Sequence, residues 1–261
     1  MSFERASRVT RDASGDFVWD VPDGWRQGRG AFGGLTIATL ARAASEDPAA
    51  QGRALRTITA EIPRAVMTGR ATIRLTTLHA GSGLSTIAAR LEQDGAVAAH
   101  AVFAFGKTRV TDFDREGIAS SPPSTFADVP VVPIAFPGPE FLQHFELRVV
   151  SGIPFSGAAE AAVDGWVRFR DPGDVPRPIA LTALVDGWFP TVLPVISEMR
   201  PFGTIAFAAH LFDRAWKLDE PLRHRARLVS SQDGYFVELR ELFTPSGELC
   251  AINQQTFAVI R

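Results

Sequence analysis

The order of predicted elements in this chain recurs once along its length, and this repeat limits the possible folds more than any other feature of the sequence. In each half a short strand and a helix precede four strands, and the last two strands form a hairpin. The first set is expected over residues 17–21, 35–44, 56–62, 70–78, 84–92 and 97–105, and the second over 165–170, 177–190, 204–212, 223–229, 235–243 and 249–260. Thr57 and Thr204 open matching strands, while Gly95 and Gly247 lie in matching hairpin turns. The chain is therefore predicted to contain two copies of one structural unit.

A Pro-rich stretch separates the two copies. It covers positions 107–139, has few periodic apolar residues, and carries Pro at 122, 123, 130, 133, 137 and 139. Proline fixes φ and lacks a backbone donor, so this stretch predicts an extended connection. We expect an N-terminal repeat over residues 1–110, a linker over 111–140 and a C-terminal repeat over 141–261.

The repeat predicts an α+β chain in which two hotdog domains lie in tandem, a double hotdog. In this layout each repeat has a long central helix wrapped by an antiparallel sheet, and the two sheets can pair edge to edge. Such pairing removes one exposed edge from each sheet, and exposed edges favour aggregation.

Charge and composition exclude several classes of function. The chain has 261 residues, of which 46% are hydrophobic and 21% charged, a balance that is sufficient for a buried core. A formal net charge of -2 provides no basic surface for nucleic acid or anionic lipid. No apolar run reaches the length of a membrane span, and the polar first 16 residues do not resemble a signal peptide. With Cys250 as its only cysteine, the protein is expected in the cytoplasm, without nucleic-acid or membrane partners.

One carboxylate interrupts the apolar segment 177–190. Pro178 suits the first turn of a helix and Pro190 ends one, so Asp186 is expected inside a short, buried helix. Burying an ionised carboxylate is costly, so it needs either a structural partner, such as an Arg or backbone N–H groups, or a catalytic task. The segment alone leaves both alternatives open.

Several short motifs accompany this carboxylate in a fixed order. Residues 28–34 (Gly-Arg-Gly-Ala-Phe-Gly-Gly) precede the first helix, a Ser230-Ser231 pair ends a strand, and residues 247–255 (Gly-Glu-Leu-Cys-Ala-Ile-Asn-Gln-Gln) belong to the last hairpin. Together with Asp186 they resemble the double-hotdog acyl-CoA thioesterases of the bacterial thioesterase II type, over nearly the whole chain. The resemblance implies hydrolysis of acyl-CoA or another acyl thioester, without a metal or other cofactor.

The resemblance also implies roles for individual residues. Asp186, Gln255 and either Ser230 or Ser231 would orient the water that attacks the thioester. Asp186 would act as the base, and a role as nucleophile is the alternative. From the residues alone, Gln255 could equally satisfy buried backbone groups, and either serine could cap a loop.

Four further residues are candidates for substrate binding, each with a structural alternative. The N–H groups of Gly33 and Gly34 could hold an oxyanion, or these glycines could allow close packing. Trp188 and Phe189 could wall an acyl tunnel, or they could be ordinary core aromatics. The five histidines show no metal-ligand spacing.

The repeat also offers an internal comparison. The offsets between the halves align Asp186 with Thr39 and Gln255 with Phe103, so only the second half is expected to carry the chemistry. We expect an acyl-CoA thioesterase that forms a homo-oligomer. The alternative is a non-catalytic acyl-CoA binding or scaffold protein with the same fold.

Overall fold

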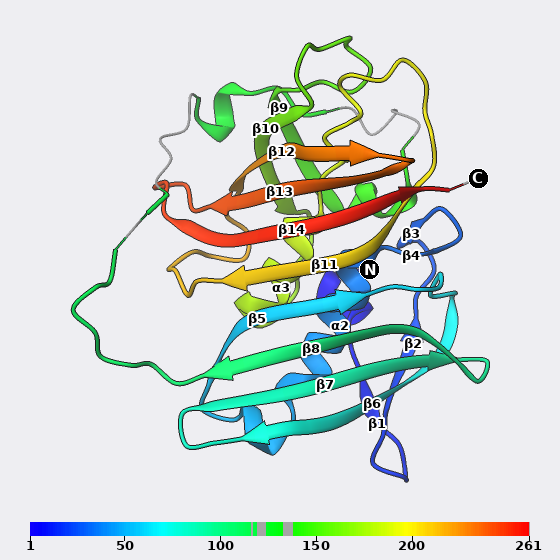
Figure 1. Cartoon of the computed structure of the whole chain (residues 1–261), viewed down its shortest axis with the longest axis vertical. Helices are drawn as coiled ribbons and strands as arrows, with labels where there is room; N and C mark the ends of the chain where they lie inside the picture. The colour runs from blue at the N-terminus through cyan, green and yellow to red at the C-terminus, as the bar shows by residue number, and fades with distance from the viewer. Residues whose placement is uncertain (116, 119–123, 133–137, 261) are drawn as a thin grey trace.

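The structure, a computed structural model, describes residues 1–115, 117–118, 124–132 and 138–260. Long antiparallel strands dominate both halves (Figure 1). The first half contributes β1 (Thr10–Arg11), β2 (Phe17–Val21), β5 (Ala54–Glu61), β6 (Gly69–Ala80), β7 (Leu84–Gln93) and β8 (Ala96–Gly106). The second contributes β9 (Phe145–Ser151), β10 (Ala162–Phe169), β11 (Phe202–Leu211), β12 (Leu222–Gln232), β13 (Tyr235–Phe243) and β14 (Leu249–Val259).

Within the described ranges, these twelve strands form one sheet whose order mirrors itself about its centre. The order is β1-β2-β6-β7-β8-β5-β11-β14-β13-β12-β10-β9. Strands β2, β6, β7, β8 and β5 of the first half therefore match β10, β12, β13, β14 and β11 of the second. The mirrored order confirms the repeat that the sequence predicted.

The two halves of the sheet join where β5 pairs with β11. The pairing is antiparallel, with Phe207 opposite Ala60 and Ala209 opposite Ile58. Because both strands are hydrogen-bonded on both sides, neither presents an exposed edge at the centre of the sheet.

The strand register relates the two halves residue by residue. The pairing of β5 with β8 shifts immediately after Leu55, which lies opposite Phe105. The pairing of β11 with β14 shifts in the same way immediately after Thr204, which lies opposite Phe257. Thr204 therefore corresponds to Leu55, two residues away from the Thr57 that the sequence predicted.

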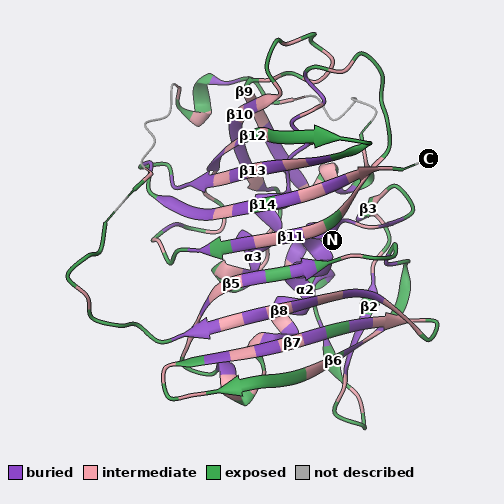
Figure 2. Cartoon of the chain, viewed as in Figure 1, coloured by how far each residue is buried: buried purple, intermediate pink, exposed green. Residues whose placement is uncertain are grey.

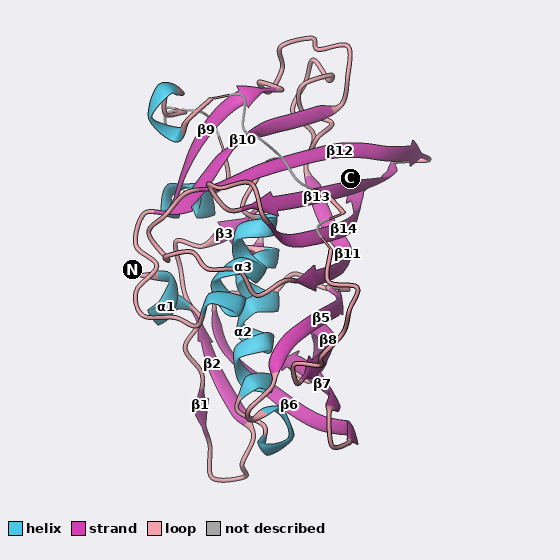
Figure 3. Cartoon of the chain, turned by 90° about the vertical axis from the view of Figure 1, so that its left-hand side faces the viewer, coloured by secondary structure: helices cyan, strands magenta, loops and turns pink. Residues whose placement is uncertain are grey.

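Two helices, α2 (Gly33–Ser45) and α3 (Arg177–Asp186), lie against one face of the sheet and pack against each other. The outer strands curl around them (Figure 3), and both helices are coloured as buried over most of their length (Figure 2). In α2 only Arg42 and Ser45 escape full burial. A helix that is buried on nearly all sides belongs to the core, and small residues such as Ala38 let its neighbours approach closely. Within the described residues, no helix is both long enough and apolar enough to cross a membrane.

The second helix is shorter than the sequence predicted. The segment up to Pro190 was expected to be helical, but α3 has 10 residues and ends at Asp186. Gly187 caps it, and its N–H donates to the carbonyl of Leu184 at 3.1 Å. The expectation of a long central helix in each repeat therefore fails for α3, and Asp186 stands at a helix end.

The Pro-rich stretch can be described only in part, because residues 116, 119–123 and 133–137 lie outside the described residues. Its described parts include the short 3-10 helix η2 (Phe126–Asp128) and the start of η3 (Glu140–His144). The N–H of Val132 donates to the carbonyl of Leu147 on β9 at 2.9 Å. The division into residues 1–110, 111–140 and 141–261 stays a prediction.

Aromatic packing fixes the loop that leads into α2. This loop contains the two-stranded ribbon of β3 (Arg26–Gln27) and β4 (Gly30–Ala31). The ring of Trp25 stacks on His144 with centroids 3.8 Å apart. The ring of Phe32 stacks on Phe141 with centroids 4.0 Å apart. Residues of η3 thereby hold the N-terminus of α2 in place.

Candidate active site

The carboxylate of Asp186 lies inside the protein at the C-terminus of α3, and the residue is only 4% exposed. Pro178 occupies the first turn of the helix, and residues 179–185 are all buried. The chain then turns at Gly187, where a Cβ would lie 2.9 Å from the ring of Phe145. The packing that shapes this helix end therefore also fixes where the carboxylate lies.

The side-chain amide of Gln255 joins this carboxylate to a hydroxyl. Its Nε2 donates to Oδ1 of Asp186 at 2.8 Å and to Oγ1 of Thr204 at 2.7 Å. Gln255 occupies a buried position of β14, between Asn253 and Phe257 on the same face, and Thr204 lies on the neighbouring β11. Three elements thus contribute a buried carboxylate, a buried amide and a partly buried hydroxyl to a single cluster.

The N-terminus of α2 meets Asp186 from the opposite side. A Cβ on Gly33 would lie 3.1 Å from Oδ2 of Asp186, and a Cβ on Gly34 would lie 2.9 Å from its Cβ. The first N–H groups of a helix have no partner within the helix and carry partial positive charge. The N–H of Gly34 favours the ionised carboxylate, although no described residue forms a well-aligned hydrogen bond to Oδ2. One carboxylate oxygen therefore faces this helix start and remains available.

Burial raises the pKa of Asp186 to about 6, because removal from water disfavours the charged form. Arg240, the amide of Gln255 and the N–H of Gly34 oppose this rise, and Glu238 adds to it. The carboxyl is consequently ionised at neutral pH and can accept a proton there. A pKa near the working pH is what a general base requires.

Two charged residues next to Asp186 were not singled out from the sequence. Arg240 and Glu238 lie on β13, and their side chains are 1% and 0% exposed. The Nη1 of Arg240 is 3.3 Å from Oδ1 of Asp186, and its Nε donates to Glu238 Oε2 at 3.0 Å. Glu238 and Arg240 occupy every second position of the strand together with Phe236 and Leu242. This spacing could have indicated from the sequence that both charges lie on the inward face of the strand.

The structure does not bring Ser230 or Ser231 to this cluster. Both are exposed residues of β12, and β13 separates β12 from β14. The hydroxyl that contacts Gln255 is that of Thr204, which the sequence singled out only as the start of a strand. To recognise it, one must know that β11 is the hydrogen-bonded neighbour of β14, and this adjacency is a tertiary feature.

The aromatic residues that follow α3 are packed into the core. Trp188 is 2% exposed and Phe189 is 9% exposed. The ring of Trp188 stacks on His224 with centroids 4.9 Å apart. Burial holds the pKa of His224 well below its usual value, so this imidazole is neutral. That Trp188 and Phe189 line an acyl tunnel stays a prediction.

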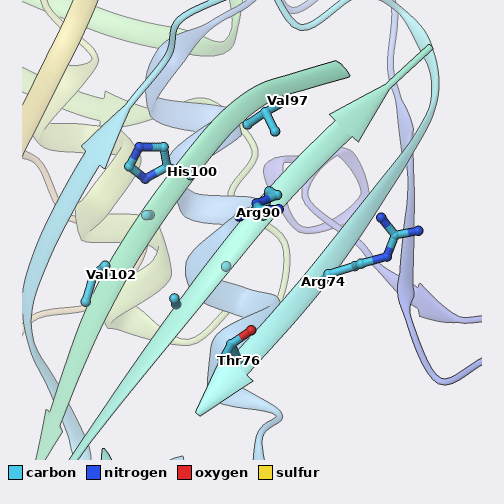
Figure 4. Close-up of a pocket in the computed structure, with 9 residues that line it drawn as sticks. Arg74, Thr76, Arg90, Val97, His100 and Val102 are labelled. Atoms are coloured by element: carbon cyan, nitrogen blue, oxygen red, sulfur yellow. The ribbon is translucent and has the colours of Figure 1, made fainter. Parts of the chain in front are cut away.

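A surface depression of about 430 Å³ lies elsewhere, on strands β6, β7 and β8. The side chains labelled in Figure 4 lie on the face of the sheet away from the helix. In this depression Arg74 forms ion pairs with Asp16 and Glu92, and His100 contacts Glu61. Both side chains therefore already have partners within the protein. Among the described residues, no group of three or more His, Cys, Asp and Glu side chains could hold a metal ion. The buried cluster around Asp186 is therefore the stronger candidate.

Two family models match the chain, one in each half. The model of the acyl-CoA thioesterase N-terminal domain matches residues 21–106, and that of the acyl-CoA thioesterase C-terminal domain matches residues 118–259. The chain belongs to the acyl-CoA thioesterase family. It is thus a thioester hydrolase, as the sequence predicted.

Solved structures share the hotdog fold with this acyl-CoA thioesterase. A conserved hot dog protein of unknown function from Alicyclobacillus acidocaldarius is 24% identical with a TM-score of 0.90, and the match covers 99% of this chain and 98% of that one. The acyl-CoA thioesterase II TesB2 of Mycobacterium marinum is 16% identical with a TM-score of 0.77, over 99% of this chain and 98% of that one. At these identities the likeness shows the fold alone. No curated protein matches the sequence.

The packing at the start of α2 predicts that Gly34→Ala destabilises the thioesterase. Alanine normally favours a helix over glycine by about 1 kcal/mol, but here its Cβ would lie 2.5 Å from the ring of Phe32 and 2.9 Å from Asp186. We expect the free energy of unfolding in urea to fall by about 1–3 kcal/mol, as for other overpacked sites. Gly83→Ala is the control, since only the end of the Arg109 side chain, 3.5 Å away, is near. A more stable Gly34→Ala variant would contradict this account of the helix contact.

The raised pKa of Asp186 predicts how stability depends on pH. Because the folded state binds the proton more tightly than the unfolded state, the stability due to this group is present below about pH 4 and is lost as pH rises through about 6. In Asp186→Asn this loss cannot occur, so the variant should gain up to about 3 kcal/mol relative to the natural protein between pH 4 and pH 7. Urea unfolding at both pH values measures this change. A stability difference that is independent of pH would mean that the carboxyl is not perturbed.

Proposed function

We propose that this thioesterase hydrolyses acyl-CoA thioesters to the free acid and CoA at a single site, using a water held by Asp186, Gln255 and Thr204. The observation that carries the proposal is the hydrogen-bonded cluster of these three side chains beside the first turn of α2. The fold that supports it is a double hotdog, with one helix and one half of the sheet in each repeat.

The chemistry needs little beyond a positioned water and a base, because a thioester is already an activated acyl group. The water oxygen attacks the carbonyl carbon while one of its protons passes to the free Oδ2 of Asp186. The amide of Gln255 and the hydroxyl of Thr204 orient the water. The carbon–sulfur bond then breaks, and the departing thiolate takes the proton back from Asp186.

The negative charge that develops on the carbonyl oxygen needs hydrogen-bond donors. The N–H groups at Gly33 and Gly34 are fixed at a helix N-terminus and need no reorganisation during the reaction. We assign them this role. In the alternative mechanism Asp186 attacks the carbonyl itself and forms a mixed anhydride, which water then hydrolyses. The free oxygen next to Gly33 suits either path, and retention of ¹⁸O from labelled water in Asp186 after one turnover would indicate the anhydride.

The register supports a single active site. Gln255 corresponds to Phe103 and Thr204 to Leu55, so these two positions of the first half carry neither an amide nor a hydroxyl. Trp188 and Phe189 would form part of the acyl-binding wall next to the active half. Action in the cytoplasm and self-association into a homo-oligomer stay predictions of the sequence.

Free-thiol release from a panel of acyl-CoAs tests the proposed function directly. Asp186→Asn should lower the rate by roughly 10²–10⁴-fold, because it removes the group that accepts the proton of the water. Gln255→Ala should lower it by a comparable factor, because it removes a group that orients the same water. The rate effects of substituting residues that serve one step are not additive. The double variant should therefore be little slower than the slower single variant. Thr204→Ala should also slow the reaction.

Two hydroxyl variants serve as controls for this experiment. Ser230→Ala removes an exposed hydroxyl on β12, and Thr39→Ala removes the buried α2 hydroxyl that the sequence offset aligned with Asp186. Both should keep nearly full turnover. Full turnover in Asp186→Asn would mean that Asp186 is not the base. Binding of acyl-CoA by the natural protein without release of free thiol would instead favour a non-catalytic acyl-CoA binding protein.

A further inference from the structure

The buried pair formed by Arg240 and Glu238 has no counterpart in the first repeat. Register places Glu238 opposite Gln255 on β13 and β14, and Ile87 opposite Phe103 on β7 and β8. Glu238 therefore corresponds to Ile87. The same register matches Arg240 with Ala89, since their partners two residues along are Asn253 and Ala101.

The first repeat thus shows what the fold alone requires at these places. Ile87 and Ala89 are 0% and 2% exposed, so the equivalent strand fills its core with apolar side chains. Removing two charges from water costs several kcal/mol per ion, and their mutual attraction often only offsets this cost. Apolar residues would serve the packing as well, so the ion pair in the second repeat needs another reason.

The contacts of Arg240 supply that reason. Its Nη1 reaches Oδ1 of Asp186 at 3.3 Å, and also the backbone carbonyls of Val185 at 3.4 Å and Asp186 at 3.3 Å. Those carbonyls belong to the last turn of α3, where a cation is favourable. One guanidinium therefore grips both the carboxylate and the end of the helix that carries it.

Glu238 in turn fixes the guanidinium. Its Oε2 accepts from Nε of Arg240 at 3.0 Å, while its Oε1 accepts from the N–H and hydroxyl of Thr191 at 2.6 and 2.9 Å. Both carboxylate oxygens are thus engaged, and Thr191 is fully buried. The arrangement runs from Thr191 through Glu238 and Arg240 to Asp186.

We propose that Arg240 and Glu238 are positioning residues, which aim the Asp186 carboxylate at the substrate water and keep it ionised until the water attacks. The inference rests on the proposed function of Asp186. With Oδ1 held by Arg240 and Gln255, the lone pairs of Oδ2 face Gly33, where the reaction would take place.

The charged and polar groups that shift the pKa of Asp186 lie on β13, β14 and α2. They are Arg240 and Glu238 on β13, the Gln255 amide on β14, and the Gly34 N–H on α2. His224 on β12 stands near Arg240 and is neutral. Arg240 is the largest influence that lowers the pKa of Asp186, whereas Glu238 raises it less. Neutralising both should therefore move this pKa upward.

The test is the double variant Arg240→Met/Glu238→Gln, which keeps the side-chain sizes and leaves neither charge unpaired in the core. The matched control is Arg223→Met/Asp164→Asn. It removes a different ion pair, which joins the neighbouring strands β12 and β10 and does not include Asp186. The carboxyl carbon of Asp186, assigned by its loss in Asp186→Asn, is titrated by ¹³C NMR in each protein. The pH profile of kcat/KM is recorded in parallel.

We expect the Asp186 titration and the acid limb of kcat/KM to move upward by about one unit or more in the double variant. A shift of one unit would reduce activity about fivefold at pH 6, with more lost through misalignment. Arg240→Lys keeps the positive charge, so the pKa of Asp186 should rise less in this variant. The control pair should leave the titration of Asp186 unchanged. An unchanged titration in the double variant would overturn the proposal. The NMR titration needs no turnover, so it separates the two proposals. If the titration shifts but Asp186→Asn retains full turnover, only the proposed function is overturned.

Discussion

The contact between the end of α3 and the start of α2 is the interaction on which the rest of the site depends. Gly33 and Gly34 allow the two helices to approach until the Asp186 carboxylate lies against the first turn of α2. This contact removes Asp186 from water and raises its pKa to about 6, while the helix N-terminus favours its charge. The stacked rings of Phe32 and Phe141 hold α2 in that position. The atoms that pack the two helices together are therefore also those of the proposed active site.

The two repeats share one fold but carry different side chains on the inward face of the sheet. Both halves share the strand order, the central helix and a register shift at the same place in β5 and β11. The inward positions of the first half hold Leu55, Phe103, Ile87 and Ala89, whereas those of the second hold Thr204, Gln255, Glu238 and Arg240. The second half gives up apolar burial for a polar network, a cost that is common at functional sites.

Local patterns were sufficient to predict much of this. Element order, most strand limits and the burial of Asp186 in a helix follow from periodicity and turn residues. Strand adjacency is not local, so the hydroxyl partner was assigned to Ser230 or Ser231 although Thr204 lies beside Gln255. Arg240 escaped notice because a single arginine in a strand is ordinarily exposed, and only the pleat shows that it faces inward.

We propose that the thioester reacts between Asp186 and the first turn of α2. The decisive measurement is a crystal structure of Asp186→Asn with a non-hydrolysable thioether analogue of acyl-CoA. We expect the reacting group beside Gly33 and Gly34, with an ordered water bonded to Gln255, Thr204 and the substituted side chain. An analogue bound beside Phe103 and Leu55 of the first repeat, with the Asp186 cluster empty, would contradict it.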